Sequence, residues 1–179
     1  MRLIRASWVA ASGFVTLLSA ATLERLSLDE LIEKSTAVVR GRVHSPRATF
    51  HGSLIYTHWT VDVLERWKGP DVSRIDVVVP GGVAGGLRQT FSGAPQMQPG
   101  DEYVLFLWTG RSGVTHVLGL SQGLFAVTKE ANGAEVASRP ASKALMLDPS
   151  SGKLVSDGSV RWRLADLRAR VVASSGGAK

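Results

Sequence analysis

One pentapeptide has the residue types and spacing of a hydrolase nucleophile. Residues 119–123 read GLSQG, which matches the nucleophile elbow, where glycines allow the sharp strand-to-helix turn that exposes a catalytic serine, here Ser121. However, residues 124–127 continue as a strand pattern, and all four histidines precede Ser121, whereas that hydrolase fold places its histidine after the serine. We therefore favour a turn or bulge in a sheet. Because serine triads occur in other chain orders, a secreted serine hydrolase using Ser121 remains the alternative.

Histidine is the commonest protein metal ligand, and this chain has four of them: His44, His51, His58 and His116. If the strands on either side of residues 51–53 pair as a hairpin, His58 lies near His44 on one outer face. Two histidines would still need a third ligand, such as Asp62 or Glu65, to hold a metal ion. We therefore interpret the histidines as surface residues, and we expect neither a metal site nor a cofactor.

The segment 80–100 is rich in glycine and proline. Backbone N–H groups of consecutive glycines can bind phosphate, but no Gly-Lys-Ser/Thr follows, so the phosphate-loop interpretation is weak. The composition predicts a long surface loop without regular structure. Because long loops in compact domains are usually functional or mobile, we place the partner-binding residues in it and on the neighbouring rim: Gly81, Gly82, Gly85, Gly86, Arg88 and Trp67.

The periodicity of apolar residues predicts a mainly β chain with one helix near each end. Ser27 followed by Glu30 is a capping-box pattern that predicts a short N-terminal helix. In a hairpin of the first two strands, Arg42 would lie opposite Asp62 as a cross-strand ion pair. Helical spacing predicts an amphipathic C-terminal helix over 159–173. Strands are predicted over residues 36–44, 55–67, 75–79, 102–108, 115–118, 124–128 and 134–137.

The first 21 residues have the pattern of a secretory signal, with basic residues, an apolar run and small residues, and we expect cleavage near Ala21. An uncleaved anchor is the alternative, because the apolar stretch 6–23 reaches the lower length that spans a bilayer. Cleavage near Ala21 would leave residues 22–179 as a single extracytoplasmic β-barrel domain, periplasmic or secreted, without a membrane span. The chain has no cysteine, which excludes disulfides and thiolate metal sites.

The chain carries a formal net charge of +6. Its basic excess gathers near the C-terminus, in Arg161, Arg163, Arg168 and Arg170. Such a cluster could bind anionic cell-surface polymers or nucleic acid. An exported protein rarely meets nucleic acid, so we expect no nucleic-acid partner and favour a solvated helix face. A structural envelope component that holds anionic polymer through these arginines is a further alternative.

Four motifs carry a family resemblance: residues 37–43 (AVVRGRV), 61–69 (VDVLERWKG), 80–82 (PGG) and 100–107 (GDEYVLFL). Together, over residues 28–128, they resemble a group of exported bacterial proteins whose β-barrel is similar to the netrin-like and metalloprotease-inhibitor OB-fold. The resemblance implies an OB-like antiparallel barrel, closed or partly open. Inhibitors of that kind place an N-terminal cysteine on the protease zinc, a mechanism that this cysteine-free chain does not share.

These observations favour an exported, non-enzymatic binding module. The sequence offers a barrel with a long loop and no complete catalytic constellation, a combination typical of recognition on a rigid scaffold. We expect it to bind a protein or cell-envelope partner, a secreted protease among them, through segment 80–100 and the adjoining rim. The alternatives are the serine hydrolase and the structural envelope component.

Overall fold

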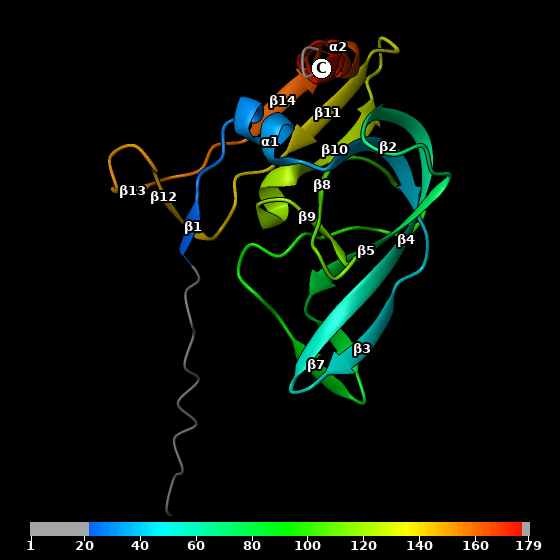
Figure 1. The fold of residues 1–179 in the computed structure, drawn as a ribbon, viewed down its shortest axis with the longest axis vertical. Coiled ribbons are helices and arrows are strands. Elements are labelled where there is room, and N and C mark those ends of the chain that lie inside the picture. Colours follow the sequence, from blue (N-terminus) through cyan, green and yellow to red (C-terminus); the bar gives the residue numbers. More distant parts are fainter. Residues whose placement is uncertain (1–21, 177–179) are drawn as a thin grey trace, which may run out of the picture.

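The computed structural model describes residues 22–176, so the expected signal at 1–21 lies outside the described residues. The chain is mainly β, as expected, with a helix near each end of the described part (Figure 1). The helical segments are α1 (Leu28–Lys34), the short 3-10 helix η1 (Leu120–Gly123) and α2 (Leu164–Gly176). The strands are β1 (Thr22–Glu24), β2 (Ala37–Val43), β3 (Arg47–His51), β4 (Leu54–Lys68), β5 (Arg74–Pro80), β6 (Gly82–Ala84), β7 (Leu87–Gln89), β8 (Glu102–Thr109), β9 (Thr115–Val117), β10 (Leu124–Lys129), β11 (Glu135–Arg139), β12 (Leu145–Leu147), β13 (Leu154–Val155) and β14 (Val160–Arg163).

Five strands close into a barrel in the order β2, β4, β5, β9 and β8, and β8 pairs with β2 again. Neighbours in this ring are antiparallel except β5 and β9, which run parallel and pair at Val77 and Thr115. Successive side chains of a strand point to opposite faces, so the alternation in β2, β4 and β5 directs one set of apolar residues inward. The barrel core includes Val39, Trp59, Val61, Leu105 and Leu107.

The sheet continues beyond the barrel from β8 through β10 and β11 to β14, and the helices pack on this extension (Figure 1). Both faces of β8 are therefore covered. Leu105 and Leu107 belong to the barrel core, whereas Val104 and Phe106 belong to a second core with residues of α1 and α2. Burial on both faces explains why residues 102–108 are almost continuously apolar instead of alternating.

Helix α1 begins at a capping box. Ser27 Oγ accepts a hydrogen bond from Glu30 N at 3.2 Å, and Glu30 Oε2 accepts one from Ser27 N at 2.9 Å. Two N–H groups that the first helical turn would leave unpaired are satisfied in this way. The buried face of α1 carries Leu31 and Ile32, which close one side of the second core.

The C-terminal helix is present, but it begins at Leu164 instead of residue 159. Residues 160–163 form β14 and pair with β11, so the prediction was wrong there. Val160 and Trp162 are half-buried and alternate with two exposed arginines, which is the period of a strand. Among residues 22–176, no helix has the length and apolar character needed to cross a membrane.

Segment 80–100 is more ordered than expected. It contains the hairpin of β6 and β7, whose two-residue turn is Gly85–Gly86, with φ of +53° and +77°. Positive φ at both positions is what a two-residue type I′ hairpin turn requires, so two of the glycines that predicted an irregular loop instead form a turn. The following residues are partly internal as well, because Ala94 and Met97 are buried.

Candidate binding site at one end of the barrel

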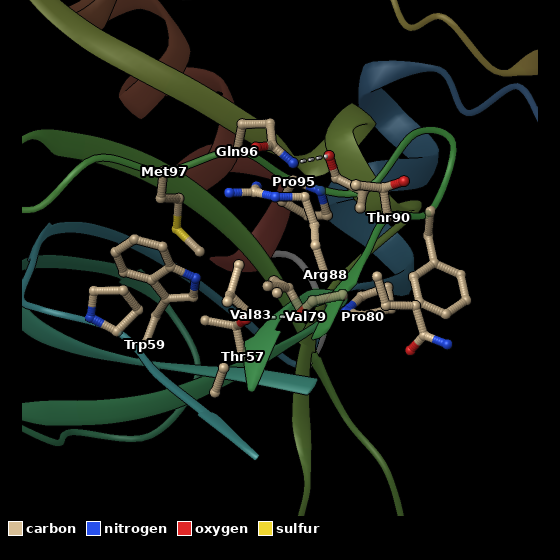
Figure 2. A pocket seen from close by; sticks show the side chains of 17 residues that line it. Thr57, Trp59, Val79, Pro80, Val83, Arg88, Thr90, Pro95, Gln96 and Met97 are labelled. Carbon is tan, nitrogen blue, oxygen red and sulfur yellow. Dashed lines mark hydrogen bonds between the residues drawn. The ribbon is translucent and has the colours of Figure 1, made fainter. Parts of the chain in front are cut away.

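The β6–β7 hairpin and the segment of residues 90–97 lie against one end of the barrel and border a half-open cavity of about 350 Å³ (Figure 2). The barrel contributes Thr57, Trp59 and Val79 to its lining, and the covering segment contributes Arg88 and Met97. Cavities of this size that combine apolar walls with a few polar groups are typical of ligand sites. Hollows of similar volume occur elsewhere on the described residues, but this one is lined by Gly81, Gly82 and Arg88 of the predicted partner-binding set, and it is therefore the candidate binding site.

The hairpin is held to β4 by hydrogen bonds at its base. Gly81 N donates to Ile55 O at 2.8 Å, and Thr57 Oγ1 donates to Gly81 O at 2.6 Å. The side chain of Gln89 accepts from Ile55 N at 2.6 Å. Gly82 has φ of +137°, and a Cβ there would lie 2.3 Å from Thr57 Oγ1, so only glycine fits this approach of hairpin to barrel.

The interior of the cavity pairs an apolar floor with a cation. Trp59, Val79 and Met97 belong to the barrel core and form part of the apolar lining, together with residues of the covering segment such as Val83 and Phe91. Arg88 is exposed, and Figure 2 shows its side chain extended over the cavity. Arg88 forms no ion pair with any of residues 22–176. An unpaired guanidinium beside an apolar surface suits a ligand that carries an anionic group next to an apolar one.

The structure unites only part of the predicted partner-binding set. Gly81, Gly82 and Arg88 line the cavity. Gly85 and Gly86 form the turn of the hairpin, outside the cavity lining. Trp67 is not part of this site: it is 5% exposed, lies in the second core, and donates its indole N–H to a glutamate on the same strand.

Sequence reasoning missed Trp59 and Met97 as site residues. Trp59 alternates with polar residues along the strand predicted over residues 55–67, which is typical of a core position, and it does lie in the barrel core. The same side chain also borders the cavity. A strand pattern distinguishes an inner from an outer face but does not indicate which inner residues lie at the end of a barrel.

The histidines do not come together as a metal site. His44 pairs with Asp62 at 2.6 Å, and His58 pairs with Asp76 at 2.8 Å. His116 Nδ1 donates to a backbone carbonyl, that of Val78, at 2.9 Å. A groove of about 300 Å³ on the outer barrel wall is bordered by three histidines: His51, His58 and His116. No group of three or more metal-ligating residues with suitable placement occurs within residues 22–176.

Ser121 lies in η1 and not on a strand-to-helix turn. Its Oγ is buried and has no hydrogen-bond partner among the described residues. A serine nucleophile needs a general base within hydrogen-bond reach, and none of the described residues supplies one to this hydroxyl. The preceding residue, Leu120, has φ of +55°, so the turn is strained at a branched side chain.

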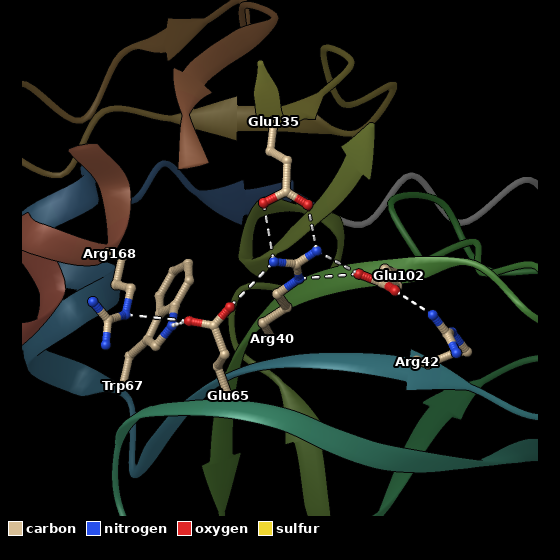
Figure 3. Close-up of polar contacts among 7 residues, drawn as sticks. All are labelled: Arg40, Arg42, Glu65, Trp67, Glu102, Glu135 and Arg168. Atoms are coloured by element: carbon tan, nitrogen blue, oxygen red, sulfur yellow. Dashed lines mark hydrogen bonds and ion pairs between the residues drawn. The ribbon is translucent and has the colours of Figure 1, made fainter. Parts of the chain in front are cut away.

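Arg40 is at the centre of an ion-pair network between the barrel and the extension (Figure 3). Its guanidinium binds Glu65 at 3.1 Å, Glu102 at 2.8 Å and Glu135 at 2.7 Å. Burial of Glu102 raises its pKa, but hydrogen bonds from Arg40 and Arg42 outweigh burial and hold that pKa below its ordinary value. Because each of these carboxylates is paired, the network joins β2, β4, β8 and β11 and is structural.

The C-terminal arginines are largely engaged within the chain. Arg161 pairs with Glu130, and Arg168 pairs with Glu65 at 3.2 Å. Arg170 binds Asp29 of α1 at 2.8 Å. These internal partners partly neutralise the basic surface on which the anionic-polymer alternative depends.

Comparison of this chain with protein-family models, with curated proteins and with solved structures found no match. No relative therefore suggests a function for this chain.

Proposed function

We propose that this chain is an exported, non-enzymatic binding module that captures a protein or cell-envelope partner at the end of the barrel covered by the β6–β7 hairpin. The observation that carries the proposal is the cavity of about 350 Å³, in which an unpaired Arg88 lies beside the apolar surface of Trp59 and Met97. Such a site recognises an apolar group next to a carboxylate or phosphate. A secreted protease is the first partner class to test, on the strength of the resemblance.

The strand order of the barrel supports an OB-like fold. The spatial order β8, β2, β4 and β5 is a Greek key, in which the fourth strand of the ring returns to lie beside the first. The fifth strand, β9, then closes the ring between β5 and β8. Five-stranded Greek-key barrels are the architecture of OB-folds, which commonly bind their ligands through one wall and its connecting loops.

Export is supported by residues 1–21, which read as a secretory signal. The absence of cysteine requires the domain to be stable without disulfides. Two cores satisfy this requirement, one inside the barrel and one between the sheet extension and the helices. A rigid scaffold of this kind can present a binding end without further bracing.

The test compares two charge reversals in an immobilised chain that is incubated with culture medium and with the solubilised envelope fraction. Arg88→Glu reverses the charge over the cavity, whereas Arg111→Glu reverses an exposed charge on the β8–β9 connection and is the matched control. We expect at least one species to be retained in equal amount by the wild type and by Arg111→Glu. The amount retained by Arg88→Glu should be lower by about tenfold or more, because an anionic group of the partner would meet a repulsive charge. If every retained species is equally abundant on all three, the proposal is wrong.

A further inference from the structure

Two β-hairpins end close together at one end of the molecule. The turn between β3 and β4 and the turn between β6 and β7 project from the end opposite α2 (Figure 1). A Cβ placed on Gly85 would lie 3.1 Å from the ring of Phe50, so the two tips are in contact. They form one composite surface, which we call the tip surface.

The tip surface exposes four large apolar side chains. Phe50 and Leu54 flank the first turn and are 48% and 37% exposed. Val83 and Leu87 lie on the second hairpin and are 51% and 62% exposed. Single exposed apolar residues are ordinary, but a group of them on adjoining protrusions marks an interaction surface. All four lie within two residues of a hairpin turn, so they are close to the tips that would meet an approaching plane.

Only cations accompany these apolar residues. Segments 44–58 and 80–100 contain Arg47 and Arg88 but no aspartate or glutamate. A nearby carboxylate is that of Asp76 on β5, which pairs with Thr60 of β4. Thr60 is six residues further along β4 than Leu54. Six residues of a strand span about 20 Å, so this carboxylate is well behind the tips. It is moreover paired with a histidine.

The depth of these charges matches a lipid interface. Arg88 directly follows Leu87 near the second turn. Arg47 is further from the tips: it pairs with His58, which is four residues further along β4 than Leu54. Interfacial segments insert apolar side chains about 5–10 Å below the headgroups while basic side chains contact anionic lipid. A surface that binds a protein typically has an apolar core depleted in charged residues, surrounded by a polar rim. The exposed apolar side chains at the tips, accompanied by arginines and by no carboxylate of the same segments, therefore favour an anionic bilayer over a protein as the partner.

We propose that the tip surface docks on an anionic lipid bilayer, with Phe50, Leu54 and Leu87 entering the headgroup region and Arg47 and Arg88 binding lipid phosphates. This inference rests on the proposed function, since it names the envelope component at the same end of the barrel. It requires no conformational change, because the apolar side chains are already exposed. The bilayer would also lie beside the cavity that Arg88 borders.

A site-specific probe tests this orientation. The chain has no cysteine, so one introduced cysteine carries an environment-sensitive fluorophore at a single position. Leu87→Cys places it on the tip surface, and Leu154→Cys places it on β13, at a leucine that is 64% exposed. The protein is recovered from an exporting host with its N-terminus determined by mass spectrometry. It is then mixed with phosphatidylcholine vesicles with and without about one third phosphatidylglycerol.

We expect a blue shift of the probe at position 87 with phosphatidylglycerol vesicles, and no shift at position 154. Phosphatidylcholine alone should give at most a small shift, and high salt should weaken the response, since salt screens attraction to anionic lipid. A shift of equal size at both positions would indicate adsorption through another part of the chain and would overturn the proposal. Absence of a shift at both positions would overturn it as well.

Matched substitutions give a second readout by vesicle sedimentation. Phe50→Ser with Leu87→Ser removes two apolar side chains that are 48% and 62% exposed, and Leu145→Ser with Leu154→Ser removes two that are 49% and 64% exposed. The first pair should lower the partition coefficient about tenfold or more and the second should leave it unchanged. Arg47→Gln with Arg88→Gln should lower it roughly fivefold for each charge. If the Phe50→Ser/Leu87→Ser variant and the Leu145→Ser/Leu154→Ser variant have equal partition coefficients, the proposal is wrong.

The two proposals fail in different ways. If a partner is captured in an Arg88-dependent manner while vesicles neither shift the probe nor sediment the protein, the partner is a protein and the lipid inference is wrong. If vesicles bind through the tip surface while no species from medium or envelope depends on Arg88, the lipid inference stands and partner capture in the cavity is wrong.

Discussion

Arg139 and Asp157 form a bidentate ion pair that is almost completely enclosed by the protein. Their contacts are Nη1 to Oδ2 at 2.6 Å and Nη2 to Oδ1 at 3.1 Å, with side chains 6% and 4% exposed. Asp157 also accepts a hydrogen bond from Ser142 N at 2.7 Å. The pair therefore fixes the connection formed by residues 140–158 to the end of β11, next to β14, the last strand of the sheet.

Asp157→Asn should destabilise the fold by about 3–5 kcal/mol, because it leaves the guanidinium of Arg139 enclosed without a counter-charge. The free energy of unfolding is measured by urea denaturation. Asp71→Asn is the control: Asp71 is 92% exposed and meets Arg66 at 3.6 Å, so its loss should cost less than about 1 kcal/mol. Equal stability of the two variants would show that the enclosed pair does not stabilise the fold.

The free energy of unfolding should decrease at acid pH, because Asp157 and Glu102 become protonated there. Burial raises both pKa values, but hydrogen bonds from arginines and, at Asp157, from backbone N–H groups outweigh it and leave both pKa values lowered. A carboxyl whose pKa is lower in the folded state stabilises the fold above its unfolded pKa, about 4, and loses that contribution as the pH falls through the folded pKa.

The difference in free energy of unfolding between wild type and Asp157→Asn should accordingly be greatest near neutral pH and shrink below about pH 4. Denaturation curves at a series of pH values between about 7 and 2 measure it. A difference that stays constant across the series would mean that the pKa of Asp157 does not change on folding.

Gly82→Ala should lower stability by about 1–3 kcal/mol or more, because the new Cβ would lie 2.3 Å from Thr57 Oγ1 and the residue has φ of +137°. Gly86→Ala is the matched control, since φ there is +77° but no atom lies within 4 Å of the added Cβ. The control bears only the backbone strain, about 1 kcal/mol. Thermal unfolding compares them, and a smaller loss at position 82 than at 86 would contradict the close approach of hairpin and barrel.

Ser121→Ala should leave stability unchanged or raise it by up to about 1 kcal/mol, because it removes a buried hydroxyl that has no hydrogen-bond partner among the described residues. Ser142→Ala is the control and should lose about 1 kcal/mol, since Ser142 Oγ accepts from Ala144 N at 3.2 Å. The wild type should not react with a fluorophosphonate probe. Labelling that disappears in Ser121→Ala would instead establish a reactive serine and revive the hydrolase hypothesis.

The strands of the barrel wall could be predicted because burial acts directly on their composition. Residues 36–44 and 102–108 were predicted as strands, and β2 and β8 occupy Ala37–Val43 and Glu102–Thr109. The β6–β7 hairpin was missed although its turn carries a signal, Gly85 followed by Gly86. The flanking strands are three residues each, too short to show an alternation.

Side-chain partners were predicted less well than strand pairing. Arg42 does lie opposite Asp62, as the hairpin interpretation expected. However, Arg42 binds Glu102 of β8 at 2.5 Å, while Asp62 binds His44 and Arg74. Both strands have a second neighbour in the closed ring, so each side chain selects among partners that the local sequence does not identify.

The sequence by itself determined the mainly β character of the chain, the wall strands and the presence of a C-terminal helix, because apolar periodicity reflects which faces are buried. Only the tertiary structure decided that β14 precedes that helix, that Trp67 lies in the second core, and that Arg88 borders a cavity while Leu87 protrudes beside Phe50. These relations depend on contacts between residues distant in the chain, which come together only when the barrel closes.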